Sequence, residues 1–306
     1  MNRRIAVIGP HRRRTGTGPF VAAFLARSGC EALAWGRAEA ALLLDANLRR
    51  PEADAVCICS PPETHLAYLE AAVNKGLHVF CEKPIVWPQD HACAAFPAII
   101  DRLSDALDRA ASRGLTVHEN TQWIYTLGDF ERLAGGIEVE EVSHFRCEMS
   151  PSESSPAEMT MESSAHGNSL LLALGVKGME DLSVRYDPGE ASGRAELDFE
   201  FRSRTPRGLP VDVQYHFAQH VAQPRHAAYE INHRRVERRV DVDGYRIWLR
   251  HGAKETMIQD PLHASLADFL TRITSPPAGR ESCDRILDNI RMSYTLLEAA
   301  SGITHA

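Results

Sequence analysis

One segment, residues 55–85, has the sequence AVCICSPPETHLAYLEAAVNKGLHVFCEKPI. The short apolar runs Asp54–Ser60 and His78–Cys81 are typical of buried strands, and Leu66–Lys75 between them has helical spacing and ends before Gly76, a usual helix stop. Two strands joined by a crossover helix lie parallel in one sheet. The segment therefore predicts an open parallel α/β sheet, in which ligands bind outside the carboxyl ends of the strands.

The same alternation of strands and helices extends from Arg4 to His118. Further strands are predicted at Arg4–Gly9, Glu31–Trp35 and Leu115–His118, and further helices at Phe20–Ser28, Ala38–Arg49 and Asp101–Arg113. Alternating strands and helices predict a doubly wound sheet with right-handed crossovers. We therefore expect residues 1–122 to form a dinucleotide-binding α/β domain.

After Trp123 the pattern changes to longer runs in which apolar and polar residues alternate, as in LDFEFRSR at residues 197–204. This alternation is typical of an antiparallel sheet with one buried face. We expect residues 123–306 to form an α+β domain with an open-faced sheet, whose C-terminal helix can pack back on the first domain. The expected strands are Val139–Met149, Ala195–Ser203, Val211–His220, Ala228–Asp241 and Tyr245–Arg250, and the expected helices are Glu162–Leu174, Leu262–Ile273 and Cys283–Ala300. The polar stretch Ser150–Thr160 is expected to be a loop, either an ordinary connection or a mobile lid.

Composition narrows the classes of function. The chain has 306 residues and a net charge of −7, which argues against a nucleic-acid binder that relies on a positive field. It has no apolar run of about 18 residues, so we expect no membrane span. Its seven cysteines, an odd number without a framework spacing, predict a reduced cytoplasmic protein.

A glycine turn follows the first strand. Gly9 ends this strand, and Gly16, Thr17 and Gly18 open the next helix, where backbone N–H groups can hold a pyrophosphate. The residues between them, 10–15, include a basic cluster, and the G-x-G-x-x-G pattern is not present. These glycines are candidates for cofactor binding, and a solvated basic loop is the alternative.

The end of the second strand indicates which dinucleotide is bound. In NAD enzymes of this fold a carboxylate lies about 20 residues after the glycine turn and holds the ribose. Here the sequence is Trp35-Gly36-Arg37, and an arginine can pair with a 2′-phosphate. We therefore expect NADP to be preferred over NAD, with Arg37 as a cofactor ligand. The alternative is that Arg37 is only an exposed residue of the next helix.

The stretch ICSPPETH…GLHVFCEKPI resembles the glucose–fructose oxidoreductase, inositol dehydrogenase and rhizopine catabolism protein family, written Gfo/Idh/MocA. The resemblance implies a Rossmann domain and a lysine, here Lys83, that touches both the nicotinamide and the reacting oxygen of the substrate. It also implies that Glu82 faces the nicotinamide ribose. Further cofactor-binding residues implied by it are Ser60, Pro61 and His65. Asn120, after the strand at Leu115–His118, is a candidate for cofactor or substrate contact, with a structural role as the alternative.

A second candidate pair lies on the helix predicted at Glu162–Leu174. Glu162 and His166 are four residues apart and so share one helix face. The resemblance implies that His166 is the catalytic acid/base, and we expect Glu162 to orient it. Glu162 replaces the usual aspartate and Ser169 stands where another aspartate is common, so a polyol substrate is not assured. The scattered histidines His216, His220, His226 and His233 indicate no metal site.

These expectations define an NAD(P)-dependent oxidoreductase. It would move a hydride between nicotinamide and a carbinol or carbonyl carbon of a small polar substrate, such as a sugar or cyclitol derivative. One alternative is a non-catalytic dinucleotide sensor, and another is an imine or C=C reductase on the same scaffold. The broad face of the second sheet indicates self-association as a homodimer or homotetramer.

Overall fold

The computed structural model describes residues 3–9, 17–45, 52–275 and 280–303. The chain divides into two compact units. Unit 1 comprises Met1–Thr121 and Leu262–Ile290, and unit 2 comprises Gln122–Pro261 and Arg291–Ala306. Residues 262–290, which the sequence analysis assigns to the second domain, thus belong to unit 1.

Unit 1 is built on a five-stranded parallel sheet in the order β2-β1-β3-β4-β5. Apolar side chains are buried along the central strands, as parallel sheets covered on both faces require. The predicted doubly wound sheet is confirmed. The strands are β1 (Arg4–Ile8), β2 (Glu31–Trp35), β3 (Ala55–Ile58), β4 (His78–Cys81) and β5 (Val117–Glu119).

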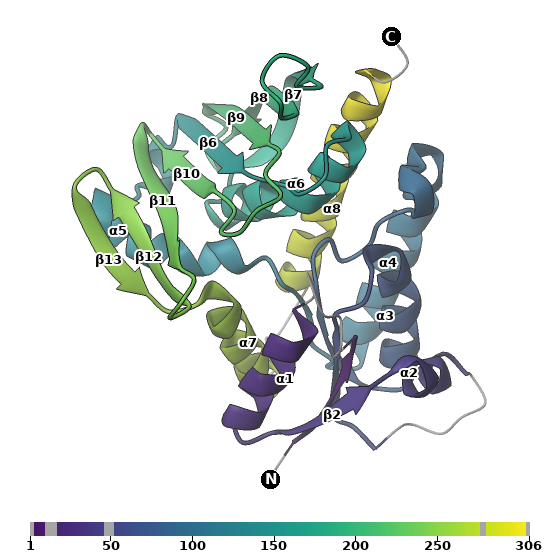
Figure 1. Ribbon diagram of the computed structural model, residues 1–306. Coiled ribbons are helices and arrows are strands. Elements are labelled where there is room, and N and C mark those ends of the chain that lie inside the picture. Colours follow the sequence, from purple (N-terminus) through teal and green to yellow (C-terminus); the bar gives the residue numbers. More distant parts are fainter. Residues whose placement is uncertain (1–2, 10–16, 46–51, 276–279, 304–306) are drawn as a thin grey trace. The chain divides into compact units, whose positions relative to one another are not determined.

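Helices cover both faces of this sheet. Helices α1 and α7 lie on one face, and α2, α3 and α4 lie on the other (Figure 1). Leu262, Leu266 and Phe269 of α7 join the core formed by β1, β3 and α1, which explains why this late segment belongs to unit 1. The helices are α1 (Gly18–Arg27), α2 (Arg37–Leu44), α3 (His65–Asn74), α4 (Phe96–Ser112) and α7 (Pro261–Arg272), with 3-10 turns at Pro62–Thr64, Gln89–His91 and Cys93–Ala95.

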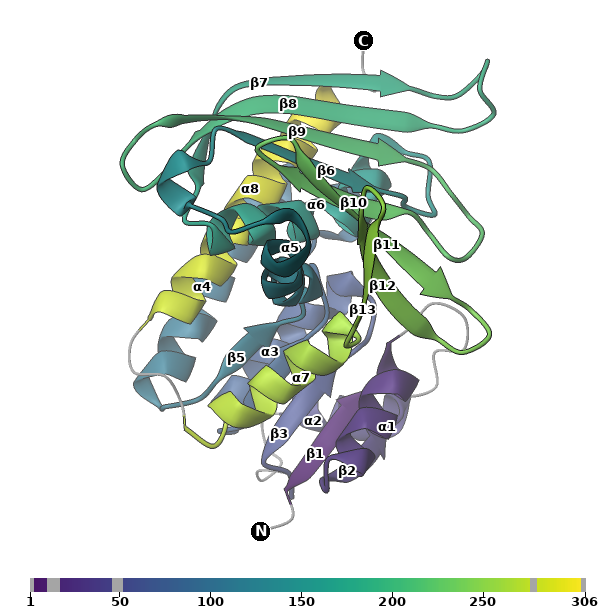
Figure 2. The same ribbon diagram turned by 90° about the vertical axis from the view of Figure 1, so that its left-hand side faces the viewer.

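Unit 2 contains an eight-stranded sheet in the order β13-β12-β11-β10-β6-β9-β8-β7. Its pairs are antiparallel except β6 with β9, so the predicted, largely antiparallel sheet is confirmed. Inward side chains of alternating positions form one core with α5 and α6. Figure 2 shows these two helices against the sheet. The strands are β6 (His144–Met149), β7 (Lys177–Asp187), β8 (Glu196–Arg204), β9 (Pro210–Ala218), β10 (Ala227–Ile231), β11 (Arg234–Asp241), β12 (Arg246–His251) and β13 (Lys254–Ile258). The helices are α5 (Leu127–Ala134), α6 (Pro156–Ala173) and α8 (Glu281–Ile303, shared with unit 1), with 3-10 turns at Gln122–Thr126 and Val139–Glu141.

The structure differs from the sequence expectation in three respects in unit 2. Helix α6 begins at Pro156, because Ser155 caps it by accepting a hydrogen bond from the backbone N–H of Glu158. Residues 156–160 of the predicted loop 150–160 are therefore helical. The predicted strand 228–241 is a hairpin, since Asn232 and His233 have positive φ angles and form a two-residue turn. Strands β7 and β13 are additional.

In the part of the chain that the structure describes, every helix is too short or too polar to span a lipid bilayer.

Candidate functional site

The first part of the candidate site is the end of β1, where Gly9 has a φ of +84°. A Cβ atom at Gly9 would lie 2.7 Å from the carbonyl oxygen of Cys59, beyond the end of β3. The close approach of the two strand ends and the positive φ both require glycine. Gly16 and the basic cluster lie outside the described residues.

Thr17 and Gly18 stand at the start of α1. Thr17 Oγ1 does not cap this helix and instead donates a hydrogen bond to Glu82 Oε1 at 2.6 Å. Asn120 Nδ2 donates to the same oxygen at 2.9 Å. Desolvation raises the pKa of the Glu82 carboxyl, while the hydrogen bonds from Thr17 and Asn120 oppose the shift. Hydrogen bonds thus bring three of the predicted cofactor residues together in unit 1, namely Thr17, Glu82 and Asn120.

Asn120 is 2% exposed. Its backbone N–H donates to the carbonyl of Cys81 at 2.8 Å. This bond holds the backbone of Asn120 beside the end of β4. Within the described ranges, its buried Oδ1 atom has no hydrogen-bond partner. Since buried polar atoms are normally satisfied, this oxygen is suited to accept a hydrogen bond from a ligand.

Lys83 follows β4 in a turn with a cis Lys83–Pro84 peptide bond. Two buried side chains hold this turn. The ring nitrogens of His65 lie 2.9 Å from the carbonyl oxygen of Pro84 and 2.8 Å from that of Ser60. The Ile85 backbone N–H donates to Oε1 of the second side chain, Glu119, at 3.0 Å. His65 is fully buried and connects the turn at Ser60 with the turn at Pro84, so it has a structural role.

Ser60 and Pro61 form the turn between β3 and α3. The hydroxyls of Ser60 and Thr64 are 2.7 Å apart, and Thr64 Oγ1 also donates to the carbonyl of Pro61 at 2.7 Å. These local bonds fix the turn at the carboxyl edge of the sheet, next to the strand that leads to Lys83. Ser60 and Pro61 remain partly exposed, as residues that line a ligand would be.

Glu119 is a candidate that sequence reasoning missed. It is 7% exposed, and burial raises the pKa of its carboxyl to about 7, against the opposing effects of Ile85, Asn289 and Lys83. Asn289 Nδ2 donates to its second oxygen at 2.9 Å. A carboxyl group that titrates near neutrality beside a lysine is typical of functional sites. The sequence feature that could have indicated Glu119 is its place as a charged residue at the end of β5, adjacent to Asn120.

Arg37 is the first residue of α2, directly after β2 and the N-cap residue Gly36. Its side chain is exposed. The residue therefore stands where the second strand of this fold places its ribose-binding group.

The second predicted pair lies in unit 2, on α6. His166 is 7% exposed, and Glu162 is partly buried. Glu162 accepts hydrogen bonds at 2.7 Å from both the backbone N–H and the hydroxyl of Ser152, and it forms an ion pair with Arg225 at 2.9 Å. Glu162 therefore holds the loop that precedes α6, a role that the sequence did not suggest.

The residues after His166 attach α6 to the sheet. A Cβ atom at Gly167 would lie 2.8 Å from Cζ of the buried Tyr215, so glycine permits this close packing. Tyr215 donates its hydroxyl to Asn168 Oδ1 at 2.9 Å, and Asn168 Nδ2 donates to Ser293 at 3.0 Å. Ser169 donates to the carbonyl of His166 at 2.8 Å. This network fixes the backbone of α6 at His166.

A cavity of about 400 Å³ also lies in unit 2, and arginines dominate its lining. Arg225, the partner of Glu162, is one of them. Arg238 donates to the carbonyl of Arg225 at 2.7 Å and lies over the ring of Trp123 at 5.7 Å. Burial lowers the pKa of its guanidinium, while Tyr245 and Asp260 oppose the shift. The charged residues of the lining are Arg194, Arg225, Glu237, Arg238, Arg239 and Arg250.

Comparisons with known proteins agree with this architecture. Residues 19–119 match the model of the Oxidoreductase family, NAD-binding Rossmann fold (Gfo/Idh/MocA). An uncharacterized oxidoreductase, YrbE of Bacillus subtilis (strain 168), is 36% identical over 52 residues, which are 17% of this chain and only 15% of the length of that relative.

Solved structures match over nearly the whole chain. UDP-N-acetylglucosamine 3-dehydrogenase from Acidithiobacillus ferrooxidans is 18% identical with a TM-score of 0.59, and the match covers 99% of this chain and 97% of that one. Myo-inositol 2-dehydrogenase from Lactobacillus plantarum is 14% identical with a TM-score of 0.65 and 98% coverage of both chains. At such identities the likeness concerns the fold.

Proposed function

Because residues 19–119 match the model of the Gfo/Idh/MocA oxidoreductase family with its NAD-binding Rossmann fold, we propose that the chain is an NAD(P)-dependent dehydrogenase or reductase. It transfers a hydride between nicotinamide and a carbinol or carbonyl carbon of a small polar substrate. The observation that carries the proposal is the turn that contains Lys83. His65 and Glu119 hold this turn by hydrogen bonds, and Glu82, itself hydrogen-bonded, comes directly before it.

The residues of unit 1 fit a dinucleotide. Gly9 leaves the strand end free of a side chain, the N-terminus of α1 can face a phosphate, and the buried Oδ1 of Asn120 can accept a hydrogen bond. Nicotinamide, when bound, supplies the site that gives or accepts the hydride. Glu82 then contacts the nicotinamide ribose, and Ser60 and Pro61 line the cofactor.

Lys83 supplies the electrostatic part of the mechanism. Its ammonium group donates a hydrogen bond to the reacting oxygen of the substrate, which polarises a carbonyl for reduction or stabilises the oxygen as an alcohol is oxidised. Glu119 acts as a positioning residue for this turn. In unit 2, His166 exchanges the proton of the reacting hydroxyl. The bonds of Glu162 to Ser152 and Arg225 support a positioning role for it through the loop before α6.

NADP is the proposed cofactor, and the support is the exposed guanidinium of Arg37 immediately after Gly36 at the end of β2. An arginine in this place can form charge-assisted hydrogen bonds with a 2′-phosphate. NAD, the alternative, would have to bind here without that phosphate.

The proposed substrate is a sugar or cyclitol derivative. The names of the two similar dehydrogenases, for a nucleotide sugar and for myo-inositol, support this class. The arginines of the cavity in unit 2 favour a derivative that carries a phosphate or carboxylate, since guanidinium groups bind such anions in a bidentate manner. We further propose a cytoplasmic enzyme that self-associates, as a homodimer or homotetramer.

The test is a turnover assay. The purified chain is mixed with NADPH or NADH and a panel of keto-sugars and keto-cyclitols, or with NADP or NAD and the corresponding alcohols, each with and without a phosphate group. Nicotinamide absorbance reports the reaction. Turnover of a carbinol or carbonyl compound supports the proposal. Tight cofactor binding without any reaction would favour a dinucleotide sensor. Reaction with imines or conjugated double bonds alone would favour an imine or C=C reductase.

A further inference from the structure

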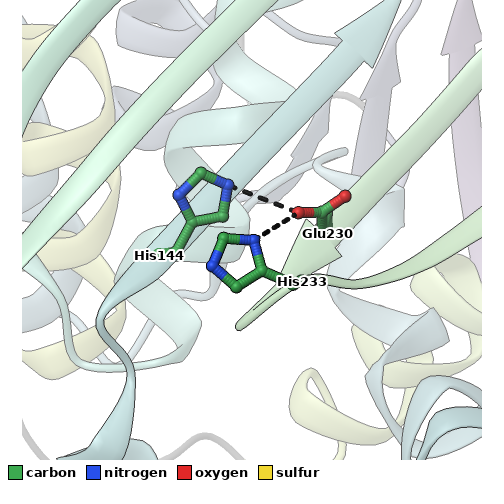
Figure 3. A group of neighbouring side chains, drawn as sticks. All are labelled: His144, Glu230 and His233. Atoms are coloured by element: carbon green, nitrogen blue, oxygen red, sulfur yellow. Dashed lines mark ion pairs between the residues drawn. The ribbon is translucent and has the colours of Figure 1, made fainter.

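Two histidines and a glutamate of unit 2 lie together at one end of the sheet (Figure 3). His144 is the first residue of β6, Glu230 lies near the end of β10, and His233 is in the turn between β10 and β11. The pairing of β6 with β10 places Glu230 opposite Arg146, so the turn after β10 lies beside His144. The sequence spacing alone does not reveal this cluster, because Glu230 lies 86 positions after His144 (230 − 144).

Both imidazole rings direct a nitrogen to the same carboxylate oxygen (Figure 3). Nε2 of His144 is 3.4 Å from Oε1 of Glu230, and Nδ1 of His233 is 3.3 Å from it. Hydrogen bonds between N–H and oxygen are shorter, at about 2.7–3.2 Å. Ligands about 2.0–2.1 Å from a tetrahedral zinc ion lie about 3.3 Å apart. These two separations are close to the edges of a metal-centred tetrahedron and longer than typical hydrogen bonds, and the three ligand atoms all lie within 4.8 Å of one another.

Asn232 holds the two histidines in register. Its backbone N–H donates to the carbonyl of His144 at 2.9 Å, and its Oδ1 accepts from the backbone N–H of His144 at 3.2 Å and of Ser143 at 2.9 Å. Its Nδ2 donates to the carbonyl of Glu141 at 2.8 Å. These bonds connect the turn that carries His233 to the strand that carries His144. The histidine backbones are thus positioned before any ligand binds.

The charges around the cluster suit a cation. The carboxylate of Glu230 supplies one negative charge, and Asp212, the partner of His144 in the adjacent strand, brings a second one nearby. Arg146 is a positive charge near His144 and opposes the binding of a cation.

We propose that His144, Glu230 and His233 bind a divalent zinc-like cation through two imidazole nitrogens and one carboxylate oxygen. The fourth position is left to water, because the side chain of His233 is 79% exposed and solvent reaches the cluster. Mixed nitrogen and oxygen ligands of this kind suit zinc rather than magnesium or calcium. The proposal is independent of the oxidoreductase activity and departs from the sequence expectation that the chain has no metal site.

The experiment is a zinc titration of the full chain after treatment with a chelator and removal of the chelator. Isothermal titration calorimetry, with competition by a chromophoric chelator, measures affinity and stoichiometry. One zinc ion per chain is expected. His144→Ala, His233→Ala and Glu230→Gln should each weaken binding by at least about a hundredfold, since loss of an outer-shell partner alone costs about 10–100-fold. Asn232→Gly keeps a residue that tolerates positive φ but removes the side-chain bonds, and should weaken binding about 10–100-fold.

The matched control is His226→Ala, because His226 directly precedes β10 but interacts with Glu148, at 3.1 Å. This variant should bind zinc as the wild type does. Circular dichroism verifies that each variant is folded. Absence of binding by the wild type, or equal binding by wild type and the His144→Ala/His233→Ala double variant, would overturn the proposal.

Discussion

Thr17 donates its hydroxyl to Oε1 of Glu82 at 2.6 Å and thereby joins the start of α1 to the residue that precedes Lys83. The start of α1 is where a helix N-terminus can face a pyrophosphate, and the turn of Lys83 is where the proposed chemistry occurs. One hydrogen bond thus links the proposed positions of the phosphate and nicotinamide ends of the cofactor. Because Asn120 donates to the same oxygen, Glu82 has little freedom to turn away.

Lys83→Met should remove the donor to the reacting oxygen. Loss of one preorganised donor to a developing oxyanion costs about a hundredfold to a thousandfold in kcat. Steady-state kinetics on any substrate found in the panel measures this loss, and cofactor affinity from fluorescence titration should change far less. Lys254→Met, at an exposed position on β13, is the control. Turnover of the Lys83 variant within a few-fold of the wild type would contradict the mechanism.

Arg37→Ala should reduce kcat/KM for NADPH by roughly 10–100-fold, because a hydrogen bond to a charged group contributes about 1.5–3 kcal/mol. The value for NADH should stay within about threefold, since NADH has no 2′-phosphate. Arg102→Ala is the control for a lost surface arginine, as Arg102 pairs with Glu70 away from the ends of the strands. A clear preference of the wild type for NADH would show that the cofactor assignment is wrong.

Glu119→Gln should change how stability depends on pH. Burial raises the pKa of Glu119 to about 7 from an ordinary value of 4.5, so the folded state holds a proton that the unfolded state has released between these values. The contribution of this group to stability is therefore present below pH 4.5 and is lost as pH rises through 7. The loss approaches about 3 kcal/mol. Urea unfolding at pH 5 and pH 8 measures the free energy of unfolding of both proteins. Relative to the wild type, the variant should be more stable at pH 8 than at pH 5.

His118 provides a contrast of opposite sign in the same unit. Burial lowers its pKa to about 4, so its contribution to stability is lost as pH falls from 6.5 towards 4. His118→Phe, beside Phe80 and Phe269, should therefore gain on the wild type at acidic pH. Parallel pH profiles for this variant and the wild type would show that the buried imidazole does not titrate in this way.

Gly167→Ala should destabilise unit 2 by about 1–3 kcal/mol, as overpacking of a core does. The added methyl group would meet the ring of Tyr215, which is buried and hydrogen-bonded to Asn168. Gly128→Ala in α5 meets nothing within 4 Å and should be neutral or stabilising by up to about 1 kcal/mol. Thermal unfolding of both variants compares the two sites, and equal midpoints would contradict the packing argument.

The sequence predicted β1, β3 and β4 because each is a short, largely buried apolar run. It did not predict β7, whose residues alternate only weakly between exposed and partly buried at the edge of the sheet. Local patterns also could not indicate that Leu262, Leu266 and Phe269 pack against β1 and β3, because these contacts join segments that are far apart in the sequence.

For the candidate site, the neighbourhood of Lys83 followed from the Glu-Lys-Pro motif, since local sequence places that turn at the end of β4. Glu119 could not be assigned in this way, because its bonds to Ile85 and Asn289 and its raised pKa arise only from tertiary packing. Glu162 has the predicted spacing from His166, yet its bonds to Ser152 and Arg225 depend on a loop whose path the sequence does not specify. The catalytic roles of Lys83 and His166 stay predictions.

The contribution of α7 to unit 1 affects how the protein can be synthesised. The ribosome releases residues 1–121 long before Leu262, Leu266 and Phe269, which cover one face of their sheet. Until those residues emerge, the nascent sheet exposes an apolar surface, and such surfaces promote aggregation. A fragment made only of residues 1–121 would keep that defect permanently. Joining residue 121 to the segment that begins at Leu262 is therefore the rational design for a separate cofactor-binding fragment.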